Sequence, residues 1–281
     1  MQHISSPSQI KEIMSAHGLT FHKGLGQNFL FDAHFLDQIV GAAELTKEDT
    51  VLEIGPGLGV LTTRMAEKAK KVIAVEIDGG IVPVLEDLTR DAGNVEIINK
   101  DILKTNLDEI LPHGEKVKVV ANLPYYITSP IVMKLLEECK NLSCIVIMIQ
   151  KEVADRIVAA PGTKDYSALS VAVQYYSNPE KRVIVPAGAF IPPPKVDSAV
   201  LRLNIPEEPK FSPDSEKIFF RTIKAAFGQR RKTLANGLST GFPELGKARI
   251  KEIISECGFP ETVRGETLSI PEFIKISNFL K

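Results

Sequence analysis

Two short stretches contain residue types and spacings that could do chemistry, and the first is residues 51–61. An apolar run there is followed by Gly55, Gly57 and Gly59, and then by an apolar pattern typical of a helix. Glycine can adopt positive φ, and it lets a ligand approach main-chain atoms without meeting a Cβ. The stretch therefore predicts a strand, a tight turn and a helix N-terminus beside a small cofactor.

The spacing of these glycines distinguishes between cofactors. The dinucleotide fingerprint is G-x-G-x-x-G, but here Val60 stands where the fingerprint has its last glycine. Pro56 also lacks a backbone N–H that could hold a phosphate. The pattern E-x-G-x-G-x-G, which starts at Glu53, resembles the S-adenosylmethionine loop of Rossmann-like methyltransferases. A dinucleotide site and a purely structural turn are the alternatives.

The second stretch is Asn122-Leu-Pro-Tyr125, directly after the apolar run 117–121. Pro124 fixes its own φ and pushes Leu123 towards extended geometry, which predicts a rigid corner that presents Asn122 and Tyr125. An adenine N6 is a weak nucleophile, and two hydrogen-bond acceptors can turn its lone pair towards a methyl donor. The Asn122 oxygen and a backbone carbonyl could be those acceptors, and Tyr125 could stack on the base.

The N-[LP]-P-Y signature is typical of enzymes that methylate an amino group, and it is more specific than the glycine loop. A turn with a purely structural role is the alternative.

Two acidic residues stand where the nucleoside part of a cofactor could bind. Glu76 lies near the end of the apolar run 72–77, about 20 residues beyond the glycine loop, where a carboxylate can accept both ribose hydroxyls. Asp101 follows the run 95–98 and could hydrogen-bond the exocyclic amine of an adenine. A solvated strand end for Glu76 and a helix N-cap for Asp101 are the alternatives.

Two further segments could border the site. Residues 23–30 are rich in glycine and could form a flap over the cofactor, or a surface loop that packs its apolar side chains on the core. Residues 192–194 are three prolines, which favour a stiff extended segment. That segment could hold Phe190 as the second wall of a clamp on the base, opposite Tyr125. Burial of Phe190 in the core is the alternative.

The apolar runs predict an α/β fold with a seven-stranded sheet, whose strands are 51–54, 72–77, 95–98, 117–121, 144–149, 182–185 and 199–205. The last two strands are expected to be an antiparallel pair. Helical periodicity is found at 7–17, from Asp32 to about 43, and at 61–69, 151–158 and 167–176. Gly79-Gly80 predicts a late start for the helix that follows.

The chain of 281 residues, 44% of them apolar, is long enough for one large domain and a small one. Pro206-Glu-Glu-Pro209 reads as a linker, so we expect a methyltransferase domain at 1–206 and a small helical domain at 207–281. The first contains 21 basic and 25 acidic residues, and the second 13 and 10. The C-terminal part is therefore mildly basic.

Basic residues are concentrated in one part of the C-terminal region. Residues 217–242 contain six basic residues and no acidic one. This pattern favours a phosphate-contacting surface over an ordinary solvated helix face. The candidate RNA-binding residues are Lys217, Arg221, Lys224, Arg230, Arg231 and Lys232.

Cys139, Cys144 and Cys257 show neither C-x-x-C spacing nor a nearby His, which indicates no disulfide framework and no metal site. Neither a signal peptide nor an apolar run of about 18 residues is present. We therefore expect a cytoplasmic protein that does not enter a membrane.

Together the motifs resemble the ribosomal RNA adenine N6,N6-dimethyltransferases of the small subunit. The matching segments follow the order of the family through nearly the whole chain, at 26–30, 53–59, 76–78, 122–125, 150–153, 190–198 and 230–234. The resemblance implies that Asn28, Leu30, Gly55, Gly57, Glu76, Ile77, Asp101, Ile102 and Asn122 bind S-adenosylmethionine. It also implies that the target base is handled by Asn122, Leu123, Pro124, Tyr125 and Phe190.

The implied reaction is dimethylation of N6 on two adjacent adenosines near the 3′ end of small-subunit (16S) rRNA, with a role in subunit biogenesis. The implied partner is an immature 30S subunit, met by a monomeric enzyme. One alternative is a large-subunit (23S) adenine methyltransferase of the macrolide-resistance type. Another is a non-catalytic assembly or transcription factor on the same fold.

Overall fold

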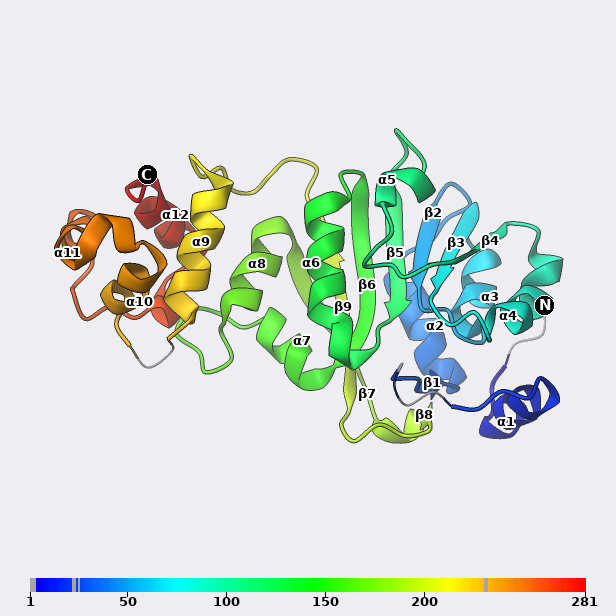
Figure 1. Ribbon diagram of the computed structural model, residues 1–281. Helices are drawn as coiled ribbons and strands as arrows, with labels where there is room; N and C mark the ends of the chain where they lie inside the picture. The colour runs from blue at the N-terminus through cyan, green and yellow to red at the C-terminus, as the bar shows by residue number, and fades with distance from the viewer. Residues whose placement is uncertain (1–3, 22–23, 25, 230–231) are drawn as a thin grey trace. The chain divides into compact units, whose positions relative to one another are not determined.

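A computed structural model describes residues 4–21, 24, 26–229 and 232–281 (Figure 1). The chain divides into two compact units, Met1–Ala154 with Pro179–Ile205, and Asp155–Asn178 with Pro206–Lys281. The second unit thus contains a segment that the sequence assigns to the first domain. The expected domains of 1–206 and 207–281 remain a prediction.

The first unit contains a seven-stranded sheet with the order β4-β3-β2-β5-β6-β9-β7 (Figure 1). The strands from β4 to β6 are parallel neighbours, and β9 runs antiparallel to β6. This arrangement confirms the predicted Rossmann-like fold. The strand bounds are β2 Thr50–Ile54, β3 Lys71–Glu76, β4 Val95–Asn99, β5 Val117–Asn122, β6 Leu142–Gln150, β7 Asn178–Val185 and β9 Ser198–Asn204.

The strand order also locates the site. From β2 the chain moves outward to β3 and β4 and then returns to β5 on the other side of β2. Ligands of open α/β sheets bind at the carboxyl ends of strands where the order reverses in this way. Strands β2 and β5 are fully or mostly buried, as parallel strands covered on both faces are. Continuous apolar runs in the sequence therefore predicted them well.

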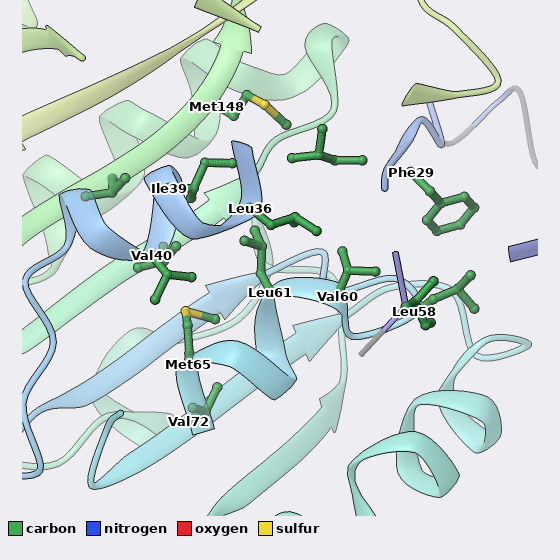
Figure 2. Close-up of a cluster of buried hydrophobic side chains, with 14 of the residues drawn as sticks. Phe29, Leu36, Ile39, Val40, Leu58, Val60, Leu61, Met65, Val72 and Met148 are labelled. Carbon is green, nitrogen blue, oxygen red and sulfur yellow. The ribbon is translucent and has the colours of Figure 1, made fainter. Parts of the chain in front are cut away.

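Helices pack around this sheet, and side chains of α2 and α3 form much of the hydrophobic core of the first unit. Figure 2 shows Leu36 and Ile39 of α2 close to Leu61 of α3, with Met148 of β6 nearby. Asp32 caps α2 as predicted, because its Oδ1 accepts from His34 N. The helices are α1 Pro7–Ala16, α2 Ala33–Ala42, α3 Val60–Ala66, α4 Val82–Thr89, α5 Leu107–Ile110, α6 Thr128–Glu138 and α7 Lys151–Ile157.

The second unit is helical and has its own core. Phe219 and Phe273 are fully buried in it, and the Tyr166 hydroxyl donates to Leu268 O at 3.0 Å. Helices α9 and α10 meet closely, since a Cβ on Gly237 would lie 2.6 Å from Ala225 O. The helices are α8 Ala168–Tyr176, α9 Glu216–Phe227, α10 Leu234–Gly241, α11 Gly246–Glu256 and α12 Ile270–Asn278. Across the described ranges, every helix is too short or too polar to cross a membrane.

Candidate active site

A pocket opens at the carboxyl ends of β2, β3 and β5, with about 1020 Å³ between its walls when the open mouth is included. Ligands of open α/β sheets bind at this edge of the sheet. The structure brings all the predicted cofactor residues and all but one of the predicted catalytic residues to its lining. These are Asn28, Leu30, Gly55, Gly57, Glu76, Ile77, Asp101, Ile102, Asn122, Leu123, Pro124 and Tyr125.

The glycine turn between β2 and α3 has the backbone that its sequence predicts. Gly55, Gly57 and Gly59 have φ values of 68°, 56° and 73°, in the left-handed region that side chains disfavour. Space is also limited at Gly57, where a Cβ would lie 2.8 Å from Phe29 Cε1. No heavy atom would lie within 4 Å of a Cβ on Gly55. Gly57 therefore serves packing, and Gly55 leaves main-chain atoms open to the pocket.

Glu76 is fixed at the end of β3 by two backbone N–H groups. Its Oε2 accepts from Gly57 N at 3.0 Å and its Oε1 from Asp78 N at 2.9 Å. Burial raises the pKa of Glu76, and these hydrogen bonds oppose the rise. Each carboxylate oxygen has a second acceptor site, so the group can still accept a pair of hydroxyls from the pocket.

Asp101 follows β4 and lines the pocket from a turn of its own. Its Oδ1 accepts from Leu103 N at 3.0 Å. This is a turn hydrogen bond and not the helix N-cap that the sequence offered as an alternative, because residues 102–104 form a turn and Asn106 caps the next helix, α5. The side chain is 26% exposed, and Lys104 Nζ lies 3.7 Å from its Oδ2. This turn and contact with a ligand are compatible.

Glu53 is a buried carboxyl in the pocket wall. It belongs to the glycine motif, but the sequence predicted no role for it. It is 1% exposed, and its Oε2 accepts from Thr62 Oγ1 at 2.5 Å. Burial raises its pKa to about 8, the Thr62 hydrogen bond lowers it, and the Glu76 charge raises it further. Glu53 is thus protonated at neutral pH, which avoids placing two negative charges side by side.

Two hydrogen bonds join residues 26–28 to the chain that follows β3 and to the end of β5. Gln27 Nε2 donates to Asp78 Oδ2 at 2.8 Å. Asn122 Nδ2 donates to Asn28 O at 3.2 Å. Residues 29–30 form β1 and are buried, so this part of the segment packs on the core, and a flap over the cofactor stays a prediction. Gln27 was not predicted as a site residue, although it lies inside a segment that was.

Tyr125 is held by a residue that the sequence did not assign to the site. Its hydroxyl lies 2.7 Å from Oγ of Ser198, a fully buried residue at the start of β9. Burial raises the pKa of the Tyr125 phenol, and the hydrogen bond opposes this rise. Ser198 ends the matched segment 190–198, which was the only signal for it.

Phe190 does not form the predicted second wall of a base clamp. It is 3% exposed in the hydrophobic core, and it does not line the pocket. The reason is that β8, Phe190–Ile191, pairs antiparallel with β1, Phe29–Leu30, with Leu30 opposite Phe190. The aromatic residue that lines the pocket mouth beside Tyr125 is Tyr126, in the short 3-10 helix η3, Tyr125–Ile127.

The residues of the predicted basic surface in the second unit have different surroundings. Arg221 is engaged inside the unit, because its Nη1 lies 2.7 Å from Glu244 Oε1 and its guanidinium covers the Phe242 ring. Glu244 lies just past the acid-free segment, so the sequence count did not reveal this ion pair. Exposed Lys217, Lys224 and Lys232 have no ion pair among the described residues. Arg230 and Arg231 lie outside the described residues.

A pocket at the switch point of a seven-stranded sheet, with an antiparallel β9 beside β6, is typical of the Rossmann-like S-adenosylmethionine-dependent methyltransferases. The model of the family described as Ribosomal RNA adenine dimethylase matches residues 18–281. The chain belongs to this family.

The relatives cover the chain from end to end. Ribosomal RNA small subunit methyltransferase A of Alkaliphilus oremlandii (strain OhILAs) is 50% identical, over 100% of this chain and 99% of that protein. The protein of the same name from Clostridioides difficile (strain 630) is 49% identical, over 100% of this chain and 98% of that protein.

Solved structures resemble the chain as well. A dimethyladenosine transferase from Plasmodium falciparum has a TM-score of 0.76 and 28% identity, over 87% of this chain and 94% of that one. The 23S rRNA methyltransferase ErmE has a TM-score of 0.68 and 27% identity, over 90% of this chain and 99% of that one.

The donor set of the pocket fits S-adenosylmethionine, the cofactor of this class. Glu76 offers acceptors for a ribose diol, and Pro56 leaves the turn without an N–H that a phosphate would need. Ile77 is 52% exposed at the pocket, where an adenine face would cover it. Among the described residues, no group of three His, Cys, Asp or Glu is arranged to hold a metal.

Proposed function

We propose that this protein dimethylates N6 of two adjacent adenosines near the 3′ end of small-subunit rRNA. Its substrate is an immature 30S subunit, it acts as a monomer, and it works in the cytoplasm, where the buried thiols of Cys139, Cys144 and Cys257 stay reduced. The chemistry is carried by one observation, the hydrogen bond between Asn122 and Asn28. The choice of subunit is supported by relatives at 47–50% identity that bear the small-subunit name.

The hydrogen bond of Asn122 supports one role for its side chain. Because Nδ2 donates to Asn28 O, Oδ1 is the atom left to accept from an adenine amino group. The second acceptor is a carbonyl of the corner. Pro124 O already accepts from Ile127 N and from Thr128 Oγ1, both at 3.2 Å. The Leu123 carbonyl is therefore the better candidate for the second N6–H.

These two acceptors hold the amino nitrogen so that its lone pair faces the methyl donor. S-adenosylmethionine supplies a methyl group activated by its sulfonium. The protonated Glu53 leaves Glu76 as the charged carboxylate of the two, which limits the negative charge beside the cofactor. Tyr125, with its hydroxyl fixed by Ser198, offers a ring on which the extruded base can stack.

Binding of the subunit depends on more than the pocket. Extruding a base costs a few kcal/mol, and the first 206 residues carry more acidic than basic side chains. The C-terminal basic residues Lys217, Lys224, Arg230, Arg231 and Lys232 supply phosphate contacts in this proposal. Naked rRNA should accordingly be a poor substrate.

The alternatives are less well supported. ErmE, which is named as a 23S rRNA methyltransferase, is 27% identical to this chain, whereas the relatives named for the small subunit reach 50%. A non-catalytic factor would not need Asn122 and Tyr125 in the lining of this pocket.

The test is methylation of under-methylated 30S and 50S subunits with labelled S-adenosylmethionine, followed by mass analysis of nucleosides and primer extension. We expect dimethyladenosine at two adjacent positions near the 3′ end of the small-subunit rRNA only. Label confined to large-subunit rRNA would contradict the proposal.

A further inference from the structure

Tyr126 is an aromatic side chain at the pocket mouth for which the mechanism above has no use. It follows Tyr125 in η3 and lines the pocket, yet it is 59% exposed. A ring of this kind combines a flat apolar face with a polar tip, and a planar partner covers such a face well. Tyr126 is thus placed to contact a ligand that binds at the mouth of the pocket.

The Tyr126 ring is positioned by the backbone at Gly26. A Cβ built on Gly26 would lie 3.4 Å from Cε1 and 3.5 Å from Cδ1 of Tyr126, and 3.5 Å from Pro124 Cβ. Gly26 also has a φ of 64°, which side chains rarely adopt. One edge of the ring therefore rests on the main chain, and most of the side chain remains open to solvent.

The two neighbouring tyrosines are held in different ways. The Tyr125 hydroxyl is bonded to buried Ser198, which directs that side chain inward. The Tyr126 hydroxyl has no partner within the part of the chain that the structure describes. Consecutive Cα atoms are about 3.8 Å apart, so the corner presents one aromatic side chain inside the pocket and one at its mouth. Successive unpaired bases bind aromatic side chains in this way.

We propose that Tyr126 stacks on the base next to the adenine in the pocket, and so holds the second target adenosine while the first is methylated. The ligand of this subsite is an unpaired purine nucleotide. The inference rests on the proposed function, because only a substrate with two adjacent targets requires its neighbouring base to be kept ready. A shift of the RNA by one nucleotide then brings that base to Asn122.

The test compares Tyr126→Ala and Tyr126→Phe on under-methylated 30S subunits. Loss of a base–aromatic stack corresponds to about 5- to 150-fold weaker binding. We expect the alanine variant to show a KM for 30S raised within this range, and more subunits with only one adenosine dimethylated. The phenylalanine variant should resemble the wild type, and S-adenosylmethionine should bind all three proteins equally. Phe279→Ala, at an exposed aromatic of the second unit, is the matched control.

Each contrary result has a separate meaning. An unchanged KM and an unchanged ratio of singly to doubly modified subunits in Tyr126→Ala would overturn the stacking role while the proposed function stands. Weaker S-adenosylmethionine binding in that variant would also overturn it, because Tyr126 would then belong to the cofactor site. A wild-type protein that leaves small-subunit RNA unmodified would overturn both proposals.

Discussion

Asn122 donates a hydrogen bond from its Nδ2 to the main-chain carbonyl oxygen of Asn28, 3.2 Å away and 94 positions earlier in the chain. The bond joins the corner after β5 to the segment before β1. It also fixes which end of the Asn122 amide faces the pocket. The side chain therefore needs both its donor and its acceptor.

Asn122→Ala and Asn122→Asp should both lose methyl transfer, with kcat lower by about 100-fold or more, as when other groups that position a substrate are removed. The aspartate keeps an acceptor but has no N–H to donate to Asn28 O, so it tests the donor, whereas the alanine removes donor and acceptor together. Binding of 30S should stay close to wild type. Asn28→Ala keeps the main-chain carbonyl and should mainly raise the KM for S-adenosylmethionine. Wild-type turnover in Asn122→Asp would refute this account.

Ser198→Ala and Tyr125→Phe should impair the same function without adding to one another. Either change removes the hydrogen bond between the two side chains, which is worth about 0.5–1.5 kcal/mol. The double variant should therefore resemble the single variants in its KM for 30S and in its free energy of unfolding. Fully additive losses would show that the two residues act independently.

Glu53→Gln should change how stability depends on pH. The pKa of Glu53 rises from 4.5 to about 8 on folding, so between these values the folded protein keeps a proton that the unfolded chain has lost. The contribution of this group to stability therefore falls as pH rises through that window and is level on either side. The glutamine variant, which keeps an acceptor for Thr62, should lack this part of the slope in urea unfolding. A slope like that of the wild type would be inconsistent with a buried, protonated Glu53.

Gly57→Ala and Gly55→Ala separate backbone strain from steric overlap. Both positions have positive φ, but only at Gly57 would the new methyl meet Phe29, 2.8 Å from Cε1. Strain alone costs about 1–2 kcal/mol, so Gly55→Ala should lose about that much stability without cofactor, and Gly57→Ala more. Chemical unfolding of the cofactor-free proteins measures the difference. Equal losses would mean that Phe29 moves aside freely.

Lys217→Ala and Lys224→Ala should weaken binding to 30S and reduce the salt dependence by about one unit of slope for each phosphate that is no longer neutralised. Arg221→Ala should act mainly on folding, because that guanidinium is paired with Glu244 and packed on Phe242. Binding titrations over a range of salt and thermal unfolding distinguish the two kinds of effect. A normal salt slope in both lysine variants would remove these residues from the interface.

The sequence predicted what depends on local backbone chemistry. The backbone geometry of a glycine turn and of a proline corner follows from the residues themselves. The parallel sheet then brings Gly55, Glu76 and Asn122 to one pocket. The sequence did not predict the surroundings of Phe190 and Arg221, for a different reason. Phe190 is opposite a residue of β1, and Arg221 forms an ion pair with Glu244. Both contacts depend on strand pairing and packing that no local sequence pattern encodes.

The same limit explains the residues that the sequence did not assign. Ser198 meets Tyr125 across 73 positions, and Gln27 meets Asp78 across 51. Tyr126 stood beside the recognised signature, but sequence alone does not show which of two adjacent tyrosines is buried.

The tripeptide 26–28 connects the strand end near Glu76 with the corner that carries Asn122. Mutations within this tripeptide should alter the kinetic constants for the methyl donor and for RNA together. A lineage that adapts to a new RNA target is therefore expected to vary elsewhere and to leave the tripeptide unchanged.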